Sequence, residues 1–451
     1  MIRSFTLLGP YRLLRAASAL ATLAVAVAPA IAQPPDEAPA PKAIRVPAAD
    51  KAGSTAFAPP GGYIPPSPAV TRFGLGECIA IALERQPAMK AAVHSLNATQ
   101  IGIRSLDSMP HLIEHLSPDL PYRRQQAQRG LVLAQAEVEK TRQEIVYDVC
   151  RFYYTYIYAR QQEQTANDFI EQMEIYYKVA EEIWKSGVRD PKIRISQFTL
   201  NVLRSAIGEL QNLRLKAQTG HRAALDALRE IMGVGPEYEF VPRDETLPLM
   251  NGTVSRDDVI AHALARRPEL AQAAAGVDAF RLEVQAQAQI RRVKAPTLAS
   301  GADLHAKQVP MPVRNGDYRP GALGPEMPAT LVGPRESRVA RALELSARQE
   351  DVYEKTVNLV RLEASNAYLT WEQSVQRLTR VKANYQRARA MVEESRAAAA
   401  TRGDPEQLVA TEALAGKAQA DYVEAVLEHL KALATLERVT AGAIRADFPG
   451  R

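Results

Sequence analysis

The sequence predicts a mainly α-helical protein made of duplicated long-helix hairpins, with a reduced β-strand part that lies mostly in the second copy. Residues 122–186 contain no proline and a single glycine, and their apolar residues recur at helical spacing. Residues 337–402 repeat this pattern, again without proline. At a rise of about 1.5 Å per residue, each stretch would form a rod of roughly 95 Å. Helices of this length favour a bundle of coiled-coil type over a globular domain.

An internal repeat is visible at matched positions of the two halves. The segment CIAIALERQPAMKAA at 78–92 matches VIAHALARRPELAQA at 259–273, so that matched positions differ by 181 in number. Further along the chain, Tyr154 matches Tyr368, and there the difference is 214. Two motifs that recur in the same order indicate a duplicated structural unit that stacks on its own copy.

The two copies are expected at 73–245 and 246–443. Because the offset grows from 181 to 214, the second copy carries 33 extra residues. A helix over 74–106 is expected before the first long helix, and shorter helices over 191–232 and 405–442 are expected after the two long ones.

The extra residues lie between about 296 and 334, in a stretch with seven prolines and five glycines. Within it, apolar and polar residues alternate as in a two-faced strand: Leu298, Ala302, Leu304 and Ala306 against Asp303, His305 and Lys307. A tilted strand of about eleven residues crosses a bilayer. A surface loop with accidental alternation explains the pattern equally well, and the one candidate partner, 327–332, is interrupted by Pro328.

The two ends of the chain have the composition of non-globular segments. Residues 1–32 are expected to be a secretory signal, because three arginines precede an apolar run and Ala30-Ile31-Ala32 offers a small-residue cleavage site. Residues 33–72 are expected to be a disordered linker, since ten of the 30 prolines fall within 33–70. Residues 444–451 are interpreted as a C-terminal tail.

Composition excludes several classes of protein. The chain has 451 residues, of which 46% are hydrophobic and 24% charged, so it can bury a large core. The net charge of +5 falls to +2 without the three arginines of the leader, which argues against a nucleic-acid partner. The two cysteines, Cys78 and Cys150, are too few for a disulfide scaffold. We expect both to be buried free thiols. A disulfide is the alternative, because helices 74–106 and 120–186 would be antiparallel if the chain reverses near residue 113, and Cys78 would then lie within one helical turn of Cys150.

No group of residues indicates an enzyme. The segment HLIEH at 111–115 has the spacing of a metalloprotease motif, but Pro110 and Pro118 confine it to about two helical turns and no third ligand motif follows. We therefore predict no catalytic, metal or cofactor-binding residue. For HLIEH we expect a loop or helix-cap role, and zinc binding or zinc catalysis is the alternative. An aromatic cluster is expected to pack between helices rather than line a substrate path: Phe152, Tyr153, Tyr154, Tyr156 and Tyr158.

Taken in order, these motifs resemble the TolC-like outer-membrane efflux protein family. LGECIAIALERQP (75–87) and SRDDVIAHALARRPEL (255–270) each open a copy and precede a long helix, a Gly/Asp turn and a returning helix. LREIMGVG (228–235) is similar to the family's end of repeat, and KAPTLASGADLHA (294–306) to its approach to the strands. The resemblance covers about 73–443.

The resemblance implies a homotrimer with neither catalytic residues nor a cofactor. Each protomer would give four strands to a twelve-strand outer-membrane barrel, and its helices would form a hollow α-barrel that crosses the periplasm. The protein would be located in the cell outer membrane and project into the periplasm. It would act as the passive duct of an efflux or secretion system for small solutes, and its partners would be a periplasmic adaptor and an inner-membrane pump.

The resemblance also assigns the two hairpin turns to a periplasmic tip that contacts the adaptor. Its candidate residues are Gly187, Val188, Arg189, Asp190, Arg402, Gly403 and Asp404. Pro191 and Pro405 would then open the returning helices, capped by the aspartates before them. Without the resemblance, the same residues are simply those that a tight turn requires.

The first copy departs from the family pattern. The numbers of Pro87 and Tyr154 differ by 67, whereas those of Pro268 and Tyr368 differ by 100, so the first copy lacks room for its strand pair. Two strands per protomer would give six in a trimer, below the eight of the smallest ordinary outer-membrane barrels. The alternative is therefore a non-transporting periplasmic helical scaffold that has lost the membrane barrel. A periplasmic adaptor is less favoured, because the chain has two hairpins and little strand.

Overall fold

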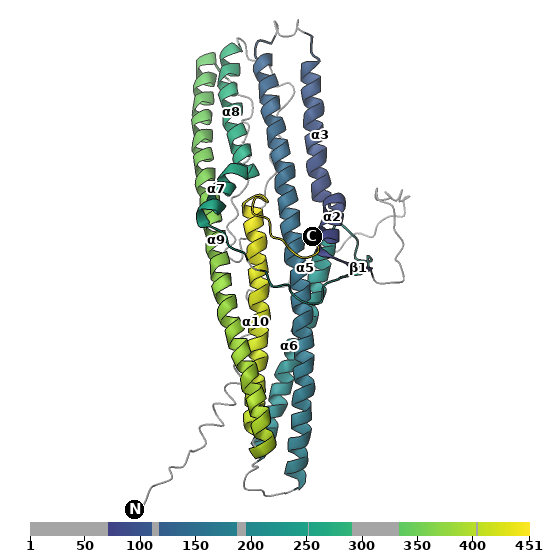
Figure 1. Cartoon of the computed structure of the whole chain (residues 1–451). Helices are drawn as coiled ribbons and strands as arrows, with labels where there is room; N and C mark the ends of the chain where they lie inside the picture. Colours follow the sequence, from purple (N-terminus) through teal and green to yellow (C-terminus); the bar gives the residue numbers. More distant parts are fainter. Residues whose placement is uncertain (1–70, 111–116, 187–194, 251, 291–332, 403–404) are drawn as a thin grey trace, which may run out of the picture.

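The structure is a computed structural model that describes residues 71–110, 117–186, 195–250, 252–290, 333–402 and 405–451. Within these ranges the chain is an elongated bundle of long helices with one small two-stranded sheet at its side (Figure 1). The predicted fold class, mainly α-helical with long packed helices and very little strand, is confirmed. The two long helices extend over Leu120–Ser186 and Arg335–Arg402, each starting two residues before the predicted start.

The helices form two series with matching lengths. The first series is α2 (Leu75–Arg85), α3 (Pro87–Asp107), α5 (Leu120–Ser186) and α6 (Gln197–Ile231). The second series is α7 (Arg256–Arg266), α8 (Pro268–Gln289), α9 (Arg335–Arg402) and α10 (Pro405–Val439). Pair by pair, they contain 11 and 11, 21 and 22, 67 and 68, and 35 and 35 residues. This agreement supports the predicted duplication, which stays a prediction.

Each series opens with two helices that are separated at a proline. The single helix expected over 74–106 is wrong, because α2 ends at Arg85 and α3 begins at Pro87. Gln86 has φ −57° and ψ 123°, outside the helical region, since a following proline disfavours the helical conformation of the residue before it. Arg267, before Pro268, has nearly the same angles, φ −62° and ψ 125°.

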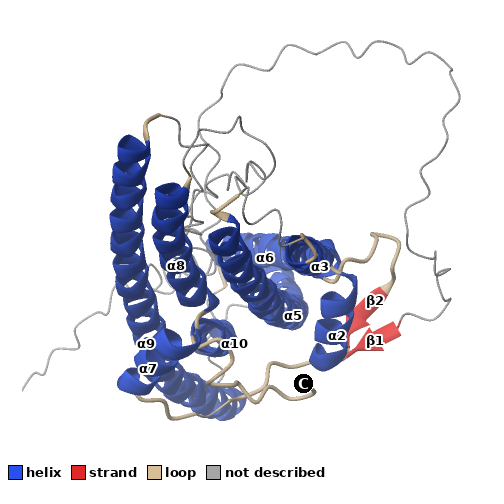
Figure 2. Cartoon of the chain, turned by 90° about the horizontal axis from the view of Figure 1, so that it is seen from above, coloured by secondary structure: helices blue, strands red, loops and turns tan. Residues whose placement is uncertain are grey.

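The long helices α5 and α9 run the length of the bundle, and the shorter helices each cover one half of it (Figure 1). In one half the packed neighbours follow in the order α3, α5, α8, α9, and in the other half in the order α6, α5, α10, α9. Figure 2 shows the first of these rows along the bundle axis. Among the described residues, neither α3 nor α6 packs extensively against α9, so each row has two open edges.

The largest core lies in the middle of the bundle, where helices of both series meet. Tyr153 and Tyr154 are fully buried there, and Tyr153 Oη donates a hydrogen bond to Asp244 at 2.9 Å. The ring of Tyr154 packs against Phe448, with 5.3 Å between the centroids. The aromatic cluster therefore packs between helices, as the sequence predicts, and its other members, Phe152, Tyr156 and Tyr158, lie in or against the same core.

The two cysteines are free and buried in this same core. The disulfide considered as an alternative is not formed. Burial raises the pKa of both thiols to about 12, with nearby carboxylates adding to the effect at Cys78. Both side chains therefore pack as small apolar groups with little thiolate at neutral pH.

The described strands join the two ends of the first helical series. β1 (Thr71–Phe73) pairs in parallel with β2 (Phe240–Pro242), and Phe73 lies opposite Pro242. The sequence predicts strand mainly in the second copy, but that segment, 298–307, and its candidate partner lie outside the described residues. The described sheet is instead a short clasp beside α2, which the sequence reasoning did not foresee.

The first returning helix begins later than predicted. Residues 195 and 196 are not helical, and α6 begins at Gln197, so the expected helix start at Pro191 is wrong. Ser196 provides the N-cap, because its hydroxyl accepts a hydrogen bond from the Thr199 backbone N–H at 3.2 Å. The second returning helix, α10, begins at Pro405 as predicted.

The C-terminal residues form a strap that joins the two series. The Gly76 backbone N–H, in α2, donates to the Gly450 carbonyl at 3.0 Å. Arg451 donates two hydrogen bonds to Glu437 in α10, at 2.5 and 2.6 Å. The segment predicted as a tail is thus packed against the core.

Candidate functional site

Both long helices finish at the same end of the bundle, and the predicted tip residues follow or end these helices in the sequence (Figure 1). α5 ends at Ser186 and α9 ends at Arg402, and both returning helices start from this same end. Arg402 is thus placed at the last position of α9. The remaining candidates lie outside the described residues: Gly187, Val188, Arg189, Asp190, Gly403 and Asp404.

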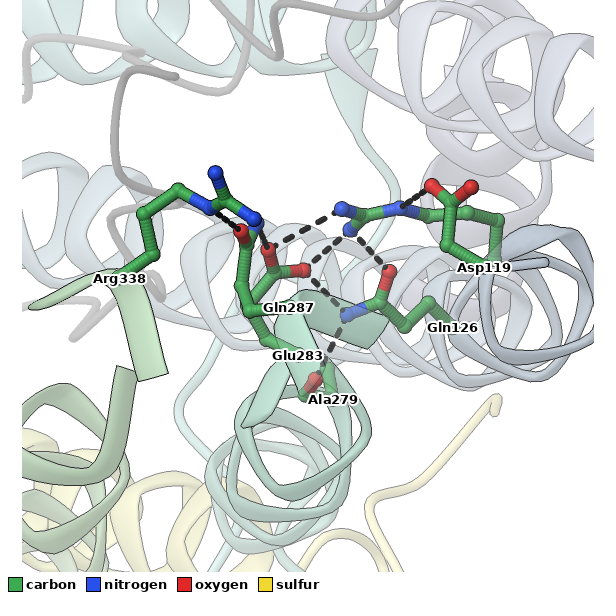
Figure 3. Close-up of polar contacts among 7 residues, drawn as sticks. Asp119, Gln126, Ala279, Glu283, Gln287 and Arg338 are labelled. Carbon is green, nitrogen blue, oxygen red and sulfur yellow. Dashed lines mark hydrogen bonds and ion pairs between the residues drawn. The ribbon is translucent and has the colours of Figure 1, made fainter. Parts of the chain in front are cut away.

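At the opposite end of the bundle, a buried polar cluster joins α5 to α8 (Figure 3). Arg123 donates hydrogen bonds to both carboxylate oxygens of Glu283, one of them at 3.1 Å. Gln126 and Gln287 also donate to Glu283, at 2.9 and 2.7 Å. The carboxylate of Asp119, the residue just before α5, lies 3.5 Å from Arg123 Nε and forms a further ion pair.

Glu283 is held in its charged form by these partners. Burial alone would raise the pKa of this carboxyl, but the hydrogen bonds and charge of Arg123 outweigh burial and hold the pKa below its ordinary value of 4.5. The side chain of Glu283 is only 6% exposed. The desolvation of so deeply buried a carboxylate must be offset by its ion pair and hydrogen bonds. Because these partners come from both helices, the cluster favours one packing arrangement of α5 against α8.

Arg338, in the first turn of α9, extends the cluster to a third helix. Its Nε donates to the side-chain oxygen of Gln287 at 3.1 Å. Its Nη1 donates to the Gly333 carbonyl at 2.9 Å, and its Nη2 donates to the Ile290 carbonyl at 2.7 Å. One guanidinium therefore bonds the end of α8 and the residues just before α9.

A second buried ion cluster lies at the middle of the bundle. Arg267, between α7 and α8, pairs with Glu269 and with Glu363 of α9, both at 2.9 Å. Arg438 of α10 donates to Glu363 at 2.7 Å, and its guanidinium stacks on Tyr147 of α5 at 5.3 Å. Two cations and two anions balance in this cluster, which joins the α7–α8 junction, α9 and α10.

A polar groove of about 380 Å³ opens between α5, α9 and α10, in the half of the bundle that ends at the tip. The Arg396 guanidinium donates to Glu412 across it, at 2.8 and 3.0 Å. Arg389 lies over the ring of Tyr385 at 6.0 Å, on the same wall. Its charged groups are of both signs, with Asp168 on the α5 side.

The described residues offer no site for a metal, because they contain no group of three or more His, Cys, Asp or Glu side chains that could bind one. The HLIEH segment at 111–115 lies outside them. In the same part of the chain, no helix combines the length and apolar character needed to cross a membrane.

Comparison with solved structures defines the class of fold. The chain matches the open state of the outer-membrane channel MtrE of Neisseria gonorrhoeae with a TM-score of 0.63 and 14% identity, over 82% of this chain and 89% of that one. The outer-membrane channel CmeC of Campylobacter jejuni matches with a TM-score of 0.63 and 10% identity, over 83% and 87%. The outer-membrane protein VceC of Vibrio cholerae matches with 0.59 and 13%, over 82% and 97%.

The chain therefore has the fold of the TolC-like outer-membrane channels. No family model matches its sequence, and no curated protein matches it. At these identities the likeness establishes the fold, and a function can be carried over only as a proposal.

Proposed function

We propose that the protein is the outer-membrane and periplasmic duct of a tripartite efflux or secretion system. Small solutes would cross it passively, driven by a partner pump, and the protein itself would catalyse no reaction. The observation that carries this proposal is the agreement in fold with outer-membrane channels over most of the chain and most of theirs.

A homotrimer is part of the proposal, and the open edges of the helical rows support it. α3 and α6 form one edge and α9 the other, so the two edges are different surfaces. Each of these edge helices carries exposed apolar side chains, including Ile101 on α3, Leu215 on α6 and Leu362 on α9. Contacts between unlike surfaces are heterologous and close into a ring when the rotation between copies allows.

The proposed orientation places the tip in the periplasm and the opposite end at the outer membrane. The adaptor would contact the tip candidates Gly187, Val188, Arg189, Asp190, Arg402, Gly403 and Asp404, and the inner-membrane pump would act through the adaptor. Residues 1–32 would direct export. The linker, expected over 33–72, would end at residue 70, because residues 71–73 form β1 and pair with β2. The arrangement of both hairpins toward one end supports this orientation.

One observation favours the alternative, a periplasmic scaffold that does not transport. The connection between α3 and α5 covers only 108–119, whereas the connection between α8 and α9 covers 290–334. The first connection is too short for two membrane-crossing strands of about ten residues each. A protein that has lost its transmembrane part would show this asymmetry.

Membrane fractionation of the natively expressed protein separates the two functions. A carbonate wash should leave the protein in the outer-membrane pellet, and gels should show an oligomer band that disappears on heating. A soluble periplasmic marker in the same lysate must be released by the wash. Release of the protein together with that marker would overturn the duct proposal in favour of the scaffold.

A further inference from the structure

Two arginines occupy the same position in the two series. Arg124 is the fifth residue of α5 and Arg338 the fourth residue of α9, so both lie at the start of a long helix. Their numbers differ by 214, as do those of Tyr154 and Tyr368. A cation at the start of a helix faces the positive end of the helix dipole, which is unfavourable unless other groups compensate. Their partners therefore decide what these two side chains do.

The two guanidinium groups make matching contacts with the helix that precedes each of them. Arg124 Nε donates to the Leu106 carbonyl at 3.1 Å, and Arg338 Nε donates to the side-chain oxygen of Gln287 at 3.1 Å. Leu106 and Gln287 are equivalent positions, because their numbers differ by 181, the offset of the first repeat match.

The second pair of contacts follows the same rule. Arg124 Nη2 donates to the Met109 carbonyl at 3.3 Å, and Arg338 Nη2 donates to the Ile290 carbonyl at 2.7 Å. The numbers of Met109 and Ile290 again differ by 181. The same nitrogen atoms thus contact the same positions in both series, although the connection between the helices is much longer in the second.

Three of the four acceptors are backbone carbonyls at or just beyond the ends of α3 and α8, namely those of Leu106, Met109 and Ile290, and the fourth is the side-chain oxygen of Gln287. The last carbonyls of a helix have no partner within the helix, and a cation there is favoured by the helix dipole. The guanidinium presents several N–H groups in a fixed plane, which lets one side chain hold acceptors on two chain segments. Arg338 is 3% exposed, so its three neutral acceptors replace the water that it has lost.

We propose that Arg124 and Arg338 are equivalent stem clamps. The first stem is the end of α3 together with the start of α5, and the second stem is the end of α8 together with the start of α9. Each arginine is a positioning residue that holds the two parts of its stem together. Each clamp fixes the spacing of the two chain ends at one connection of the bundle. Arg338 also donates to the Gly333 carbonyl at 2.9 Å, on the far side of the longer connection, and Arg124 also lies 3.9 Å from the carboxylate of Asp107 at the end of α3. This role does not depend on the proposed duct function.

The clamps are tested by distances between spin labels in the full-length protein. Labels at Gln289 and Pro334 report on the second stem, and labels at Ser108 and Pro118 report on the first, since all four residues are exposed. The native Cys78 and Cys150 are retained, because their side chains are buried, at 0% and 2% exposed, and out of reach of the label.

Each substitution should act on its own stem. Arg338→Ala should broaden the 289–334 distance distribution and leave 108–118 unchanged, and Arg124→Ala should do the reverse. Arg338→Lys keeps the charge but loses the fork, so it should behave like Arg338→Ala. Arg341→Ala is the matched control, because Arg341 is exposed one turn along the same helix. An unchanged 289–334 distribution in Arg338→Ala, or equal broadening of both stems by either alanine variant, would overturn the proposal.

Discussion

Arg267, at the junction of α7 and α8, forms a buried ion pair with Glu363 in the middle of α9, with 2.9 Å between their charged atoms. Both side chains are less than a tenth exposed, at 3% and 7%. Glu363 also accepts a hydrogen bond from Arg438 of α10. The Glu363 carboxylate therefore binds two arginines at once, and it connects α9 to the α7–α8 junction and to α10 at the level of the main core.

Glu363→Gln should strongly destabilise the fold, because it leaves two buried arginines without their shared carboxylate. Breaking a buried pair on one side typically costs about 3–5 kcal/mol. The matched control is Glu393→Gln, whose carboxylate is 69% exposed and pairs with Arg396 at 3.4 Å. That change should cost less than about 1 kcal/mol. Denaturant midpoints at one protein concentration measure both, and equal midpoints would contradict the structural role of Glu363.

The stabilisation from Glu283 should depend on pH. Its partners hold the pKa of this carboxyl below 4.5, so its contribution is complete above that pH and is lost as the pH falls through the folded-state pKa. The difference in unfolding free energy between the natural protein and Glu283→Gln should therefore be large at neutral pH and shrink as the pH falls below 4.5 through the folded-state pKa. Glu350→Gln, which breaks the exposed pair with Arg281, is the control. A Glu283 difference that stays constant with pH would refute the assignment.

Much of the fold could be predicted because its signals are local. A stretch without proline and with periodic apolar residues fixes a helix by itself, and both long helices were found within two residues of their predicted starts. The helix break at Gln86 could also have been predicted from Pro87, which follows it. A single helix was predicted instead, because the apolar residues keep a helical spacing on both sides of the break. At the start of α6 the Asp-Pro signal at 190–191 was misleading, because Ser196 provides the cap.

The polar clusters could not be predicted, because their partners are distant in sequence. Glu283 and Gln287 are four residues apart on α8, a spacing that is equally common on a solvated helix face. Only the packing of α5 against α8 reveals Arg123 as the partner of Glu283, 160 residues away. The parallel pairing of β1 with β2 has the same origin, since three-residue strands carry no periodic signal.

Substituting alanine for two glycines of the first series, one against the C-terminal strap and one away from it, should have opposite effects on stability. A Cβ atom at Gly76 would lie 2.7 Å from the Gly450 carbonyl oxygen, so Gly76→Ala must displace the strap. Such overpacking costs about 1–3 kcal/mol. At Gly102, on α3, nothing lies within 4 Å of the added atom, and Gly102→Ala should stabilise the helix by about 0.5–1 kcal/mol. Thermal melts should shift in opposite directions, and a neutral Gly76→Ala would show that the strap does not need this close approach.

The proposed tip assignment predicts that a charge change at Arg402 weakens binding of the proposed adaptor without disturbing assembly. Arg402→Glu reverses the charge at the end of α9, and a loss of one favourable contact would lower the affinity about ten-fold, or ~1.4 kcal/mol. Arg380→Glu makes the same change on an exposed part of α9 away from the tip. Binding of the purified adaptor to immobilised protein measures both variants. The tip assignment would fail if Arg380→Glu weakened binding as much as Arg402→Glu did.

In the proposed ring, the effect of a substitution on assembly should depend on whether its helix lies at the edge or in the interior of the row, more than on how exposed the side chain is in one protomer. Leu215 and Ile175 are similarly exposed, at 61% and 53%, but Leu215 lies on the edge helix α6 and Ile175 on α5, which has neighbours on both sides. An aspartate at a contact between copies would bury an unpaired charge, whereas one on an interior helix would remain in water. Leu215→Asp should therefore lower the mass of the detergent-solubilised particle toward that of one protomer, and Ile175→Asp should leave it unchanged. If both variants dissociate, or if neither does, α6 is not the seam between copies.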